Sequence, residues 1–322
     1  MFGRPARVGD LETALSIDPF SFGGEIVGRS KALAACAQLV RTGRMFSTVV
    51  EIPRAGGGRQ MIGFGGALFV SDAFFQQEIG DPKPGLNSRI IASLVRKKPV
   101  VLTHDEVGRD NTSGGLNVVI TQAGCVPNTL NAEQTSAFES VMAYAFFQLM
   151  RGYRLRRVFR EAGSAEAIAH VKSQRVFAQM VTFDRYHAAH PASRWNHDRA
   201  LFVAEREHCL SLPASVASML FTYSEPVMGL RDTDQELLLA ALDGLTDGEL
   251  ADVLDLKLPA LKKRWASLFD RVARVRPDLV PQSDRETTDT RGPQKRHRLL
   301  AYFREHAEEL RPRSAKPSRR PR

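Results

Sequence analysis

The chain has 322 residues, of which 43% are hydrophobic and 25% charged, a composition typical of soluble globular proteins rather than of disordered or fibrous chains. Its length favours about two domains. Of the formal net charge of +9, six positive charges lie in the last twelve residues, "RPRSAKPSRRPR", so the overall charge indicates a basic, disordered tail rather than a nucleic-acid-binding surface.

Several other classes are disfavoured by simple patterns. The longest apolar run, "VMAYAFFQLM", is about half the ~20 residues of a membrane-spanning helix, so we expect a buried helix there, no membrane contact and a cytoplasmic location. Cys36, Cys125 and Cys209 are odd in number and far apart, which predicts reduced thiols rather than disulfides or a zinc site. The glycines of "AGGG" and "GFGGAL" complete no phosphate-binding motif. We therefore expect no cofactor.

The first half of the chain predicts an α+β domain over residues 25–163, preceded by a loose segment over 1–24. The elements expected, in order, are a helix from Ser30 to Gly43, a hairpin with "AGGG" at its tip, a helix opened by Pro84, strands at "PVVLTHDEV" and "GLNVVITQAG", and about thirty helical residues from Asn131. This order of elements is that of a small sensor domain of the PAS, GAF or autoinducer-binding kind. Such a domain could hold a small-molecule ligand, whose identity the sequence leaves open.

Residues 164–228 predict a helical connector that contains a histidine-rich segment. His187, His190 and His197 follow the spacing H-x2-H-x6-H with Pro191 between them. These positions do not share one helical face, and no H-E-x-x-H motif is present, so we expect solvated loop histidines and no metal. An enzyme with its site in this region remains an alternative, which metal analysis would test.

Residues 229–280 predict three helices with sharp boundaries. "LRDTDQELLLAALDG" is one helix, Thr246-x-x-Glu249 is a capping box that starts a second, and Pro259 suits the first turn of a third. The third helix has an apolar stripe, which comprises Leu261, Trp265, Leu268, Phe269 and Val272. From Leu230 to Val272 there are nine acids and six bases, and five of the bases fall at or after Lys257. A helix, a short turn and a basic helix are typical of a helix-turn-helix DNA reader.

At these residues the sequence resembles the C-terminal domain of LuxR-type (GerE-type) transcriptional regulators. The counterparts of the family pattern are Gly244-Leu245-Thr246, Glu249-Leu250-Ala251, Leu254, Leu256 and Ala260-Leu261-Lys262. The resemblance implies an all-α DNA-binding domain, a recognition helix in the major groove and a homodimer. Two residues, Lys257 and Pro259, depart from the family pattern. The implied DNA-binding residues are Thr246, Lys257, Ala260, Lys262, Lys263, Arg264, Ser267 and Arg271.

The prediction is therefore a sequence-specific transcriptional regulator and not an enzyme, with double-stranded DNA as its partner and RNA polymerase as a second candidate partner. A linker and C-terminal helix over 281–310, with Leu299, Phe303, Ala307 and Leu310 on one side, could form the dimer contact; residues 311–322 are the tail. The alternative from another class is a protein-interaction module, in which the helical segment docks on RNA polymerase or a sigma-like partner without reading DNA.

Overall fold

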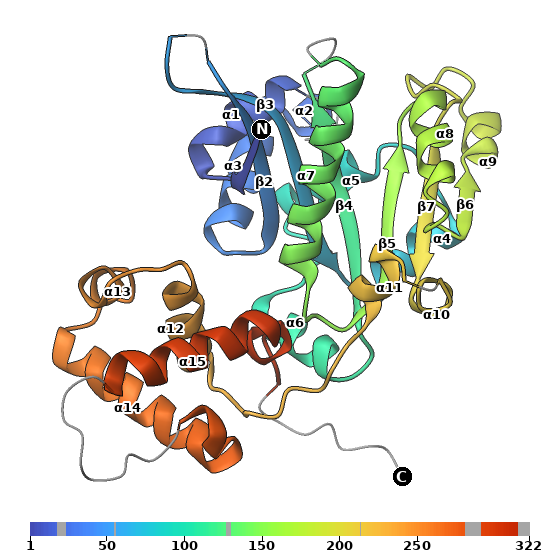
Figure 1. The fold of residues 1–322 in the computed structure, drawn as a ribbon. Coiled ribbons are helices and arrows are strands. Elements are labelled where there is room, and N and C mark those ends of the chain that lie inside the picture. The colour runs from blue at the N-terminus through green and yellow to red at the C-terminus, as the bar shows by residue number, and fades with distance from the viewer. Residues whose placement is uncertain (18–23, 55, 127–129, 213, 281–290, 315–322) are drawn as a thin grey trace, which may run out of the picture. The chain divides into compact units, whose positions relative to one another are not determined.

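A computed structural model of the chain describes residues 1–17, 24–54, 56–126, 130–212, 214–280 and 291–314. It forms two compact units (Figure 1). The sheet unit comprises Met1–Met150, Arg154–Thr222 and Arg313–Arg322, and the helical unit comprises Arg151–Tyr153 and Tyr223–Pro312. Among the described residues, no helix is both long and apolar enough to cross a membrane.

The sheet unit is built on one mixed sheet of seven strands. The order across the sheet is β1-β2-β3-β4-β5-β7-β6, and every neighbouring pair is antiparallel except β4 and β5, which run parallel. The strands are β1 (Phe2–Pro5), β2 (Met45–Pro53), β3 (Arg59–Val70), β4 (Leu116–Cys125), β5 (Leu155–Ala162), β6 (Gln179–Thr182) and β7 (Ala200–Glu205).

The predicted hairpin is confirmed. β2 and β3 pair from Met45↔Leu68 to Pro53↔Arg59. Gly56, Gly57 and Gly58 at its tip all have positive φ, the backbone region that glycine alone adopts without strain. The predicted strand "GLNVVITQAG" is confirmed as β4.

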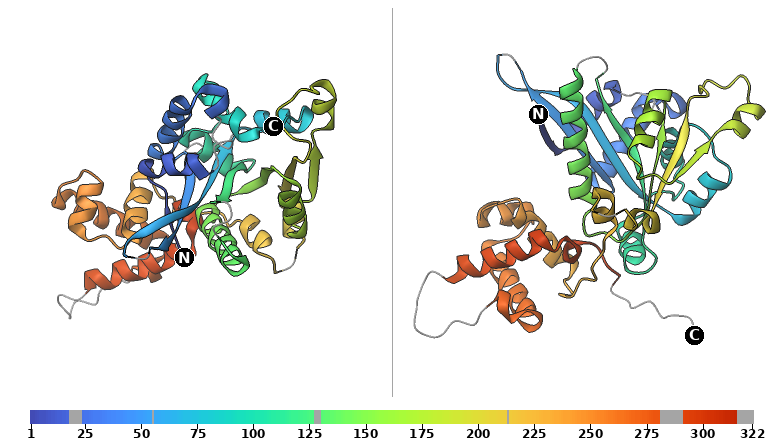
Figure 2. Two further views of the ribbon diagram at one scale, coloured as in Figure 1. Left: turned by 90° about the horizontal axis from the view of Figure 1, so that it is seen from above. Right: turned by 45° about the vertical axis from the view of Figure 1, so that its right-hand side comes forward.

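Helices cover both faces of the sheet (Figure 2). Neighbouring residues of a strand point to opposite faces; accordingly, Val49 belongs to a core under α1, α3, α4 and α5, whereas Val50 belongs to a second core under α7. The helical elements of this unit are η1 (Val8–Asp10), α1 (Leu11–Ile17), α2 (Gly24–Val27), α3 (Arg29–Arg41), α4 (Asp72–Gly80), α5 (Leu86–Val95), α6 (His104–Thr112), α7 (Ala132–Met150), α8 (Ala165–Ser173), α9 (Asp184–Ala189), α10 (Arg206–Leu210) and α11 (Val216–Phe221).

The predicted fold class is wrong for this unit. In place of a small sensor domain there is a seven-stranded sheet. It includes β1 from the segment expected to be loose, and β6 and β7 from the segment expected to be a helical connector. The thirty-residue helix predicted from Asn131 ends at Met150, because Gly152 adopts a φ of 84° and turns the chain into β5. The strand expected at "PVVLTHDEV" is reduced to a bridge at Val101, followed by α6.

The helical unit buries one continuous core. The predicted capping box is confirmed: the Thr246 hydroxyl accepts a hydrogen bond from the Glu249 backbone N–H at 3.4 Å, and the Glu249 carboxylate accepts one from the Thr246 N–H at 2.8 Å. Asp255, with a φ of 50°, makes the turn before α14. The elements are α12 (Asp232–Leu242), α13 (Asp247–Val253), α14 (Leu258–Val275), η3 (Pro277–Leu279), α15 (Arg291–Glu305) and η4 (Ala307–Leu310).

The apolar stripe predicted on the third helix faces this core, in which Leu261, Trp265, Leu268 and Val272 are buried. Leu299 and Phe303 of α15 and Leu310 of η4 are buried in the same core. These side chains therefore pack inside their own unit, and the apolar face expected to make a dimer is already used. Residues 281–290 of the predicted linker and 315–322 of the predicted tail lie outside the described residues.

Candidate active site

A β-bulge marks the place where the two parallel strands part. Gly66 of β3 pairs with Gln122 and Ala67 pairs with Ile120, so Thr121 is an extra residue in β4, a feature that bends a strand and is over-represented next to active sites. The parallel pairing of β4 with β5 ends at Ile120↔Arg160. Beyond this point β4 pairs only with β3, and β5 only with β7. Two strand edges therefore diverge inside the sheet.

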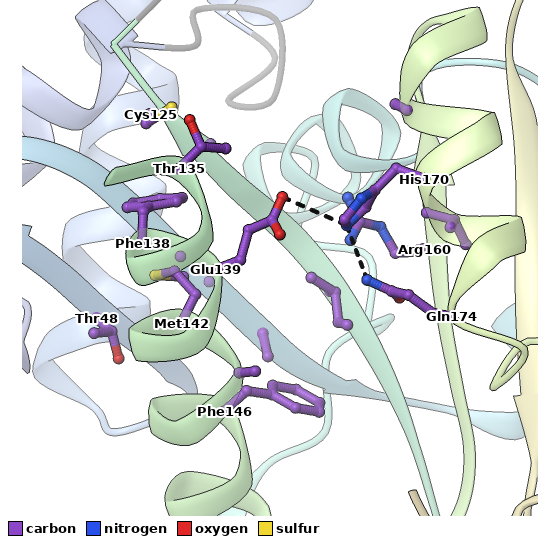
Figure 3. Close-up of a pocket in the computed structure, with 18 of the residues that line it drawn as sticks. Thr48, Cys125, Thr135, Phe138, Glu139, Met142, Phe146, Arg160, His170 and Gln174 are labelled. Atoms are coloured by element: carbon purple, nitrogen blue, oxygen red, sulfur yellow. Dashed lines mark hydrogen bonds and ion pairs between the residues drawn. The ribbon is translucent and has the colours of Figure 1, made fainter. Parts of the chain in front are cut away.

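A pocket of about 510 Å³ opens over this divergence, between α7 and α8 (Figure 3). β2, β3 and β4 form its floor, with two glycines of β3, Gly65 and Gly66, among the lining residues. A Cβ on Gly66 would lie 2.7 Å from the Thr121 hydroxyl oxygen, so the bulge needs glycine opposite it. The lining is mostly apolar.

The apolar wall comes from α7. Phe138, Met142 and Phe146 recur every four residues and so share one helical face. Phe138 also packs against Val50 and Ile62 of the sheet. This helix contains the apolar run that predicted a buried helix, and part of that apolar surface lines the pocket.

Arg160 of β5 brings a cation into this apolar surrounding. It is half-buried, and burial lowers the pKa of its guanidinium below the usual value. In the described part of the chain its Nε atom is buried and has no hydrogen-bond partner. A buried donor without a partner costs free energy. An oxygen anion of a ligand would supply the missing partner.

His170 of α8 faces Glu139 of α7 across the pocket (Figure 3). Its Nε2 atom lies 3.7 Å from Glu139 Oε1 and 3.0 Å from Gln174 Nε2. The Gln174 amide nitrogen can only donate a hydrogen bond. His170 Nε2 therefore accepts it when the imidazole is neutral. The imidazole is about half exposed and can therefore exchange protons with solvent.

The remaining titratable groups of the pocket are not nucleophiles. Burial raises the pKa of the Cys125 thiol, with a further contribution from Glu139, so this cysteine stays neutral and unreactive at neutral pH. Hydrogen bonds from the backbone and from Ser164, at the start of α8, lower the pKa of Glu166. The three cysteines are unpaired; Cys36 and Cys209 are buried and Cys125 is half-buried.

Arg160, Glu139 and His170 are not among the site residues predicted from the sequence. The long helix predicted from Asn131 includes Arg160, so the sequence pattern did not place this residue on a strand beside β4. Gly152 was the available signal, because a glycine two residues after an apolar helix is typical of a helix end. The closeness of Glu139 and His170 depends on two helices that are separated by β5.

The histidine-rich segment is more ordered than expected. The rings of His187 and His197 lie 4.1 Å apart, and His190 stacks on Tyr186 at 4.4 Å. His187 is 5% exposed, and burial, followed by the charge of His197, lowers its pKa. Within the described ranges, no group of three or more histidine, cysteine, aspartate or glutamate side chains is arranged to hold a metal ion.

The residues predicted to contact DNA all lie in α13 and α14 or at their starts. Five are exposed, namely Thr246, Lys257, Ala260, Lys262 and Lys263; Arg264 and Ser267 are half-buried. Arg271, expected on a phosphate, instead lies with its Nε 3.2 Å from buried Asp234. Thr246 acts as the cap of α13, and Lys257 precedes α14 without a side-chain cap.

No family model and no curated protein matches the chain. Among solved structures it is similar to a mosquito arylalkylamine N-acetyltransferase like 5b, with 12% identity over 63% of this chain and 99% of that one, at a TM-score of 0.38. It is also similar to an agmatine N-acetyltransferase mutant (12% identity, 63% and 98% coverage, TM-score 0.37) and to Naa20 of Chaetomium thermophilum (15% identity, 66% and 90% coverage, TM-score 0.32). With TM-scores below 0.5, these likenesses assign this chain no substrate and place none of its residues.

These comparisons correct the regulator hypothesis. The resemblance to LuxR-type regulators rests on residues that match no family model, and the similar solved chains are N-acetyltransferases. The expected function as a sequence-specific transcriptional regulator is wrong, and so is the expectation that the protein is not an enzyme. Double-stranded DNA, RNA polymerase and the homodimer are withdrawn as partners. The alternative of a docking module for RNA polymerase falls as well.

Proposed function

We propose that the pocket between α7 and α8 is the active site of an enzyme that transfers an acyl group from a thioester to an amine. The observation that carries the proposal is the guanidinium of Arg160 at the point where β4 and β5 part, whose buried Nε atom has no hydrogen-bond partner among the described residues. Negative charge develops on the carbonyl oxygen when an acyl carbon is attacked, and a preorganised buried cation stabilises that charge more strongly than water does.

The diverging strands suit the thioester that donates the acyl group. Beyond Ile120 and Arg160, the two strand edges have no pairing with each other, and a strand edge presents N–H and C=O groups that an extended chain can pair with. A thioester carried on an amide-bearing arm can lie along such edges with its acyl group at Arg160. The apolar wall of α7 favours an amine with an apolar body.

His170 supplies the proton acceptor. The amine nitrogen attacks the thioester carbon, its proton passes to His170 Nε2, and the carbon–sulfur bond breaks. The departing thiolate takes a proton from water, and His170 returns its proton to solvent. Glu139, at 3.7 Å, stabilises the imidazolium that forms. A positioned general base of this kind contributes about 10²- to 10⁴-fold to the rate.

The first experiment measures thiol release from acetyl-coenzyme A with a panel of alkyl, arylalkyl and diamine acceptors. We expect turnover, and we expect Arg160→Met to lower kcat/KM by about 10²- to 10³-fold. His170→Gln should lower kcat by about 10²-fold or more. Arg156→Met is the matched control, because Arg156 is an exposed cation on the same strand that pairs with Asp72 at 3.1 Å; it should leave the rate unchanged.

Two results would contradict the proposal. One is that the wild-type protein neither binds acetyl-coenzyme A in calorimetry nor releases thiol with any amine. The other is turnover that is indifferent to Arg160→Met. We place the enzyme in the cytoplasm as part of the same proposal, since its three cysteines are unpaired, as is usual in a reducing compartment.

A further inference from the structure

The N-terminal turn of α5 touches both parallel strands where they separate. On one side the Asn87 side-chain amide donates a hydrogen bond to the Thr121 carbonyl oxygen at the bulge of β4. On the other side the Glu161 carboxylate of β5 accepts hydrogen bonds from the backbone N–H groups of Gly85, at 3.0 Å, and Leu86, at 2.6 Å. Ile120 and Arg160 line the pocket, so their neighbours Thr121 and Glu161 point to the opposite face of the sheet.

Each half of this contact has a physical reason. The first N–H groups of a helix have no partner within the helix, and α5 has Gly85 as its N-cap, with no side chain to accept from them. The Glu161 carboxylate accepts these hydrogen bonds instead, and the positive end of the helix dipole stabilises its negative charge. Its side chain is 4% exposed and is held from behind by Arg199, whose Nε lies 2.6 Å away.

The position of α5 is itself fixed. Gly85 has a φ of 80°, and a Cβ there would lie 2.4 Å from Trp195 Cζ2. The guanidinium of Arg199 covers the Trp195 ring at 4.7 Å. The helix start, the tryptophan and the Glu161–Arg199 pair therefore form one packed assembly.

Buried polar atoms at the bulge are left unsatisfied. In the described part of the chain, Asn87 Oδ1 and Thr121 Oγ1 are buried and have no hydrogen-bond partner. Strand edges ordinarily pair, yet β4 and β5 stop pairing with each other at Ile120↔Arg160. Something must therefore hold the strands apart.

We infer that the first turn of α5 is a wedge that sets the separation of β4 and β5, and that Asn87 and Glu161 are positioning residues for the pocket on the other face. Neither side chain lines the pocket; each acts through its strand. The role in catalysis rests on the proposed acyl transfer, whereas the wedge itself does not.

Hydrogen exchange of the ligand-free, full-length protein tests the wedge directly. We expect Asn87→Ala to slow exchange at those backbone amides of 122–125 and 161–162 that are not paired with β3 or β7, because the edges can then approach and pair. Glu161→Leu should do so more strongly than Glu161→Gln, which keeps one acceptor oxygen. Glu205→Gln is the matched control, because Glu205 lies on β7 and pairs with Arg157 of β5 at 3.1 Å; it should change nothing at these amides.

The catalytic consequence is measured on the same variants. Asn87→Ala should raise KM for acetyl-coenzyme A about tenfold, the worth of one hydrogen bond, and leave kcat within about twofold. Unchanged or faster exchange in both Asn87→Ala and Glu161→Gln would overturn the wedge, even in an active enzyme. Slower exchange in a protein that neither binds nor turns over acetyl-coenzyme A would support the wedge and overturn the acyl transfer.

Discussion

At the scale of single residues, the proposed site is defined by a guanidinium that meets no counter-charge among the described residues. An arginine that only stabilised the fold would be paired. Arg157, on the same strand as Arg160, is paired with Asp72 and Glu205. Arg160 has apolar neighbours and a buried Nε atom without a partner instead. Residues that violate the ordinary rules of burial concentrate at functional sites, where the cost in stability is offset by binding or catalysis.

This cost can be measured. We expect Arg160→Met to raise the free energy of unfolding of the sheet unit by about 1 kcal/mol, because an apolar side chain of similar length replaces a half-buried guanidinium whose buried Nε has no hydrogen-bond partner among the described residues. Urea unfolding followed by circular dichroism gives the value, with Arg157→Met as the comparison that should be less stable than wild type. A loss of stability in Arg160→Met would mean that the guanidinium has a stabilising partner.

At the scale of elements, local rules predicted local structure well. The hairpin of β2 and β3, the buried stripe of α14 and the capping box of α13 depend on residues close in the sequence, and all three are confirmed. The helix predicted from Pro84 is also present, although Gly85 and not Pro84 is its N-cap. Turn residues and periodicity determine such features almost without tertiary context.

The site depends on pairings that no local pattern contains. The parallel pair β4–β5 joins residues separated by α7, and the bulge at Thr121 is defined only by its partner strand. The basic run around Arg156 and Arg157 is compatible with a helix or with a strand, so periodicity could not decide between them. The resemblance of residues 229–280 to a known DNA-binding pattern reflected the geometry of capped helices, which many helical units share.

The capping box provides a stability test at this scale. We expect Thr246→Ala to lower the free energy of unfolding of the helical unit by about 1 kcal/mol, because the Glu249 N–H loses its acceptor, whereas Thr246→Ser should be close to wild type. Trp265 lies in the core of this unit, so its fluorescence reports the transition in a Trp195→Phe background. Equal stability of the alanine and serine variants would show that the cap contributes nothing.

At the scale of the whole chain, each unit has its own core. In the helical unit, Glu309 joins residues that are far apart in the sequence, and it is 2% exposed. Its carboxylate accepts hydrogen bonds from the backbone N–H groups of Val227, at 2.8 Å, and Met228, at 3.0 Å. Gln235 donates to the carbonyl oxygens of Glu309 and Arg311 at 3.1 and 2.9 Å. Residues some eighty positions apart are thereby joined.

Removing this carboxylate should be costly. We expect Glu309→Ala to lower the free energy of unfolding of the helical unit by about 2–3 kcal/mol, since two buried N–H groups lose a charged acceptor. Glu308→Ala is the control, because among the described residues the Glu308 carboxylate pairs locally, with His306 at 2.9 Å, and its loss should cost little. If the two variants unfold at the same urea concentration, the hydrogen bonds to the Glu309 carboxylate do not stabilise the unit.

The hydrogen bonds to Glu309 have a consequence for how this protein can be divided by engineering. Because Val227 and Glu309 are in hydrogen-bond contact, the two ends of the 223–312 segment of the helical unit lie close together, and the sheet unit is continued by Arg313 and Ser314, which pack on Gly108 of α6. This segment, which carries all the named helices of the unit, is thus a cassette inserted into the sequence of the sheet unit; Arg151–Tyr153 is the other segment of the helical unit. Such a cassette can be excised and its ends bridged by a short linker, or exchanged for another, without cutting a strand of the sheet that carries the proposed active site.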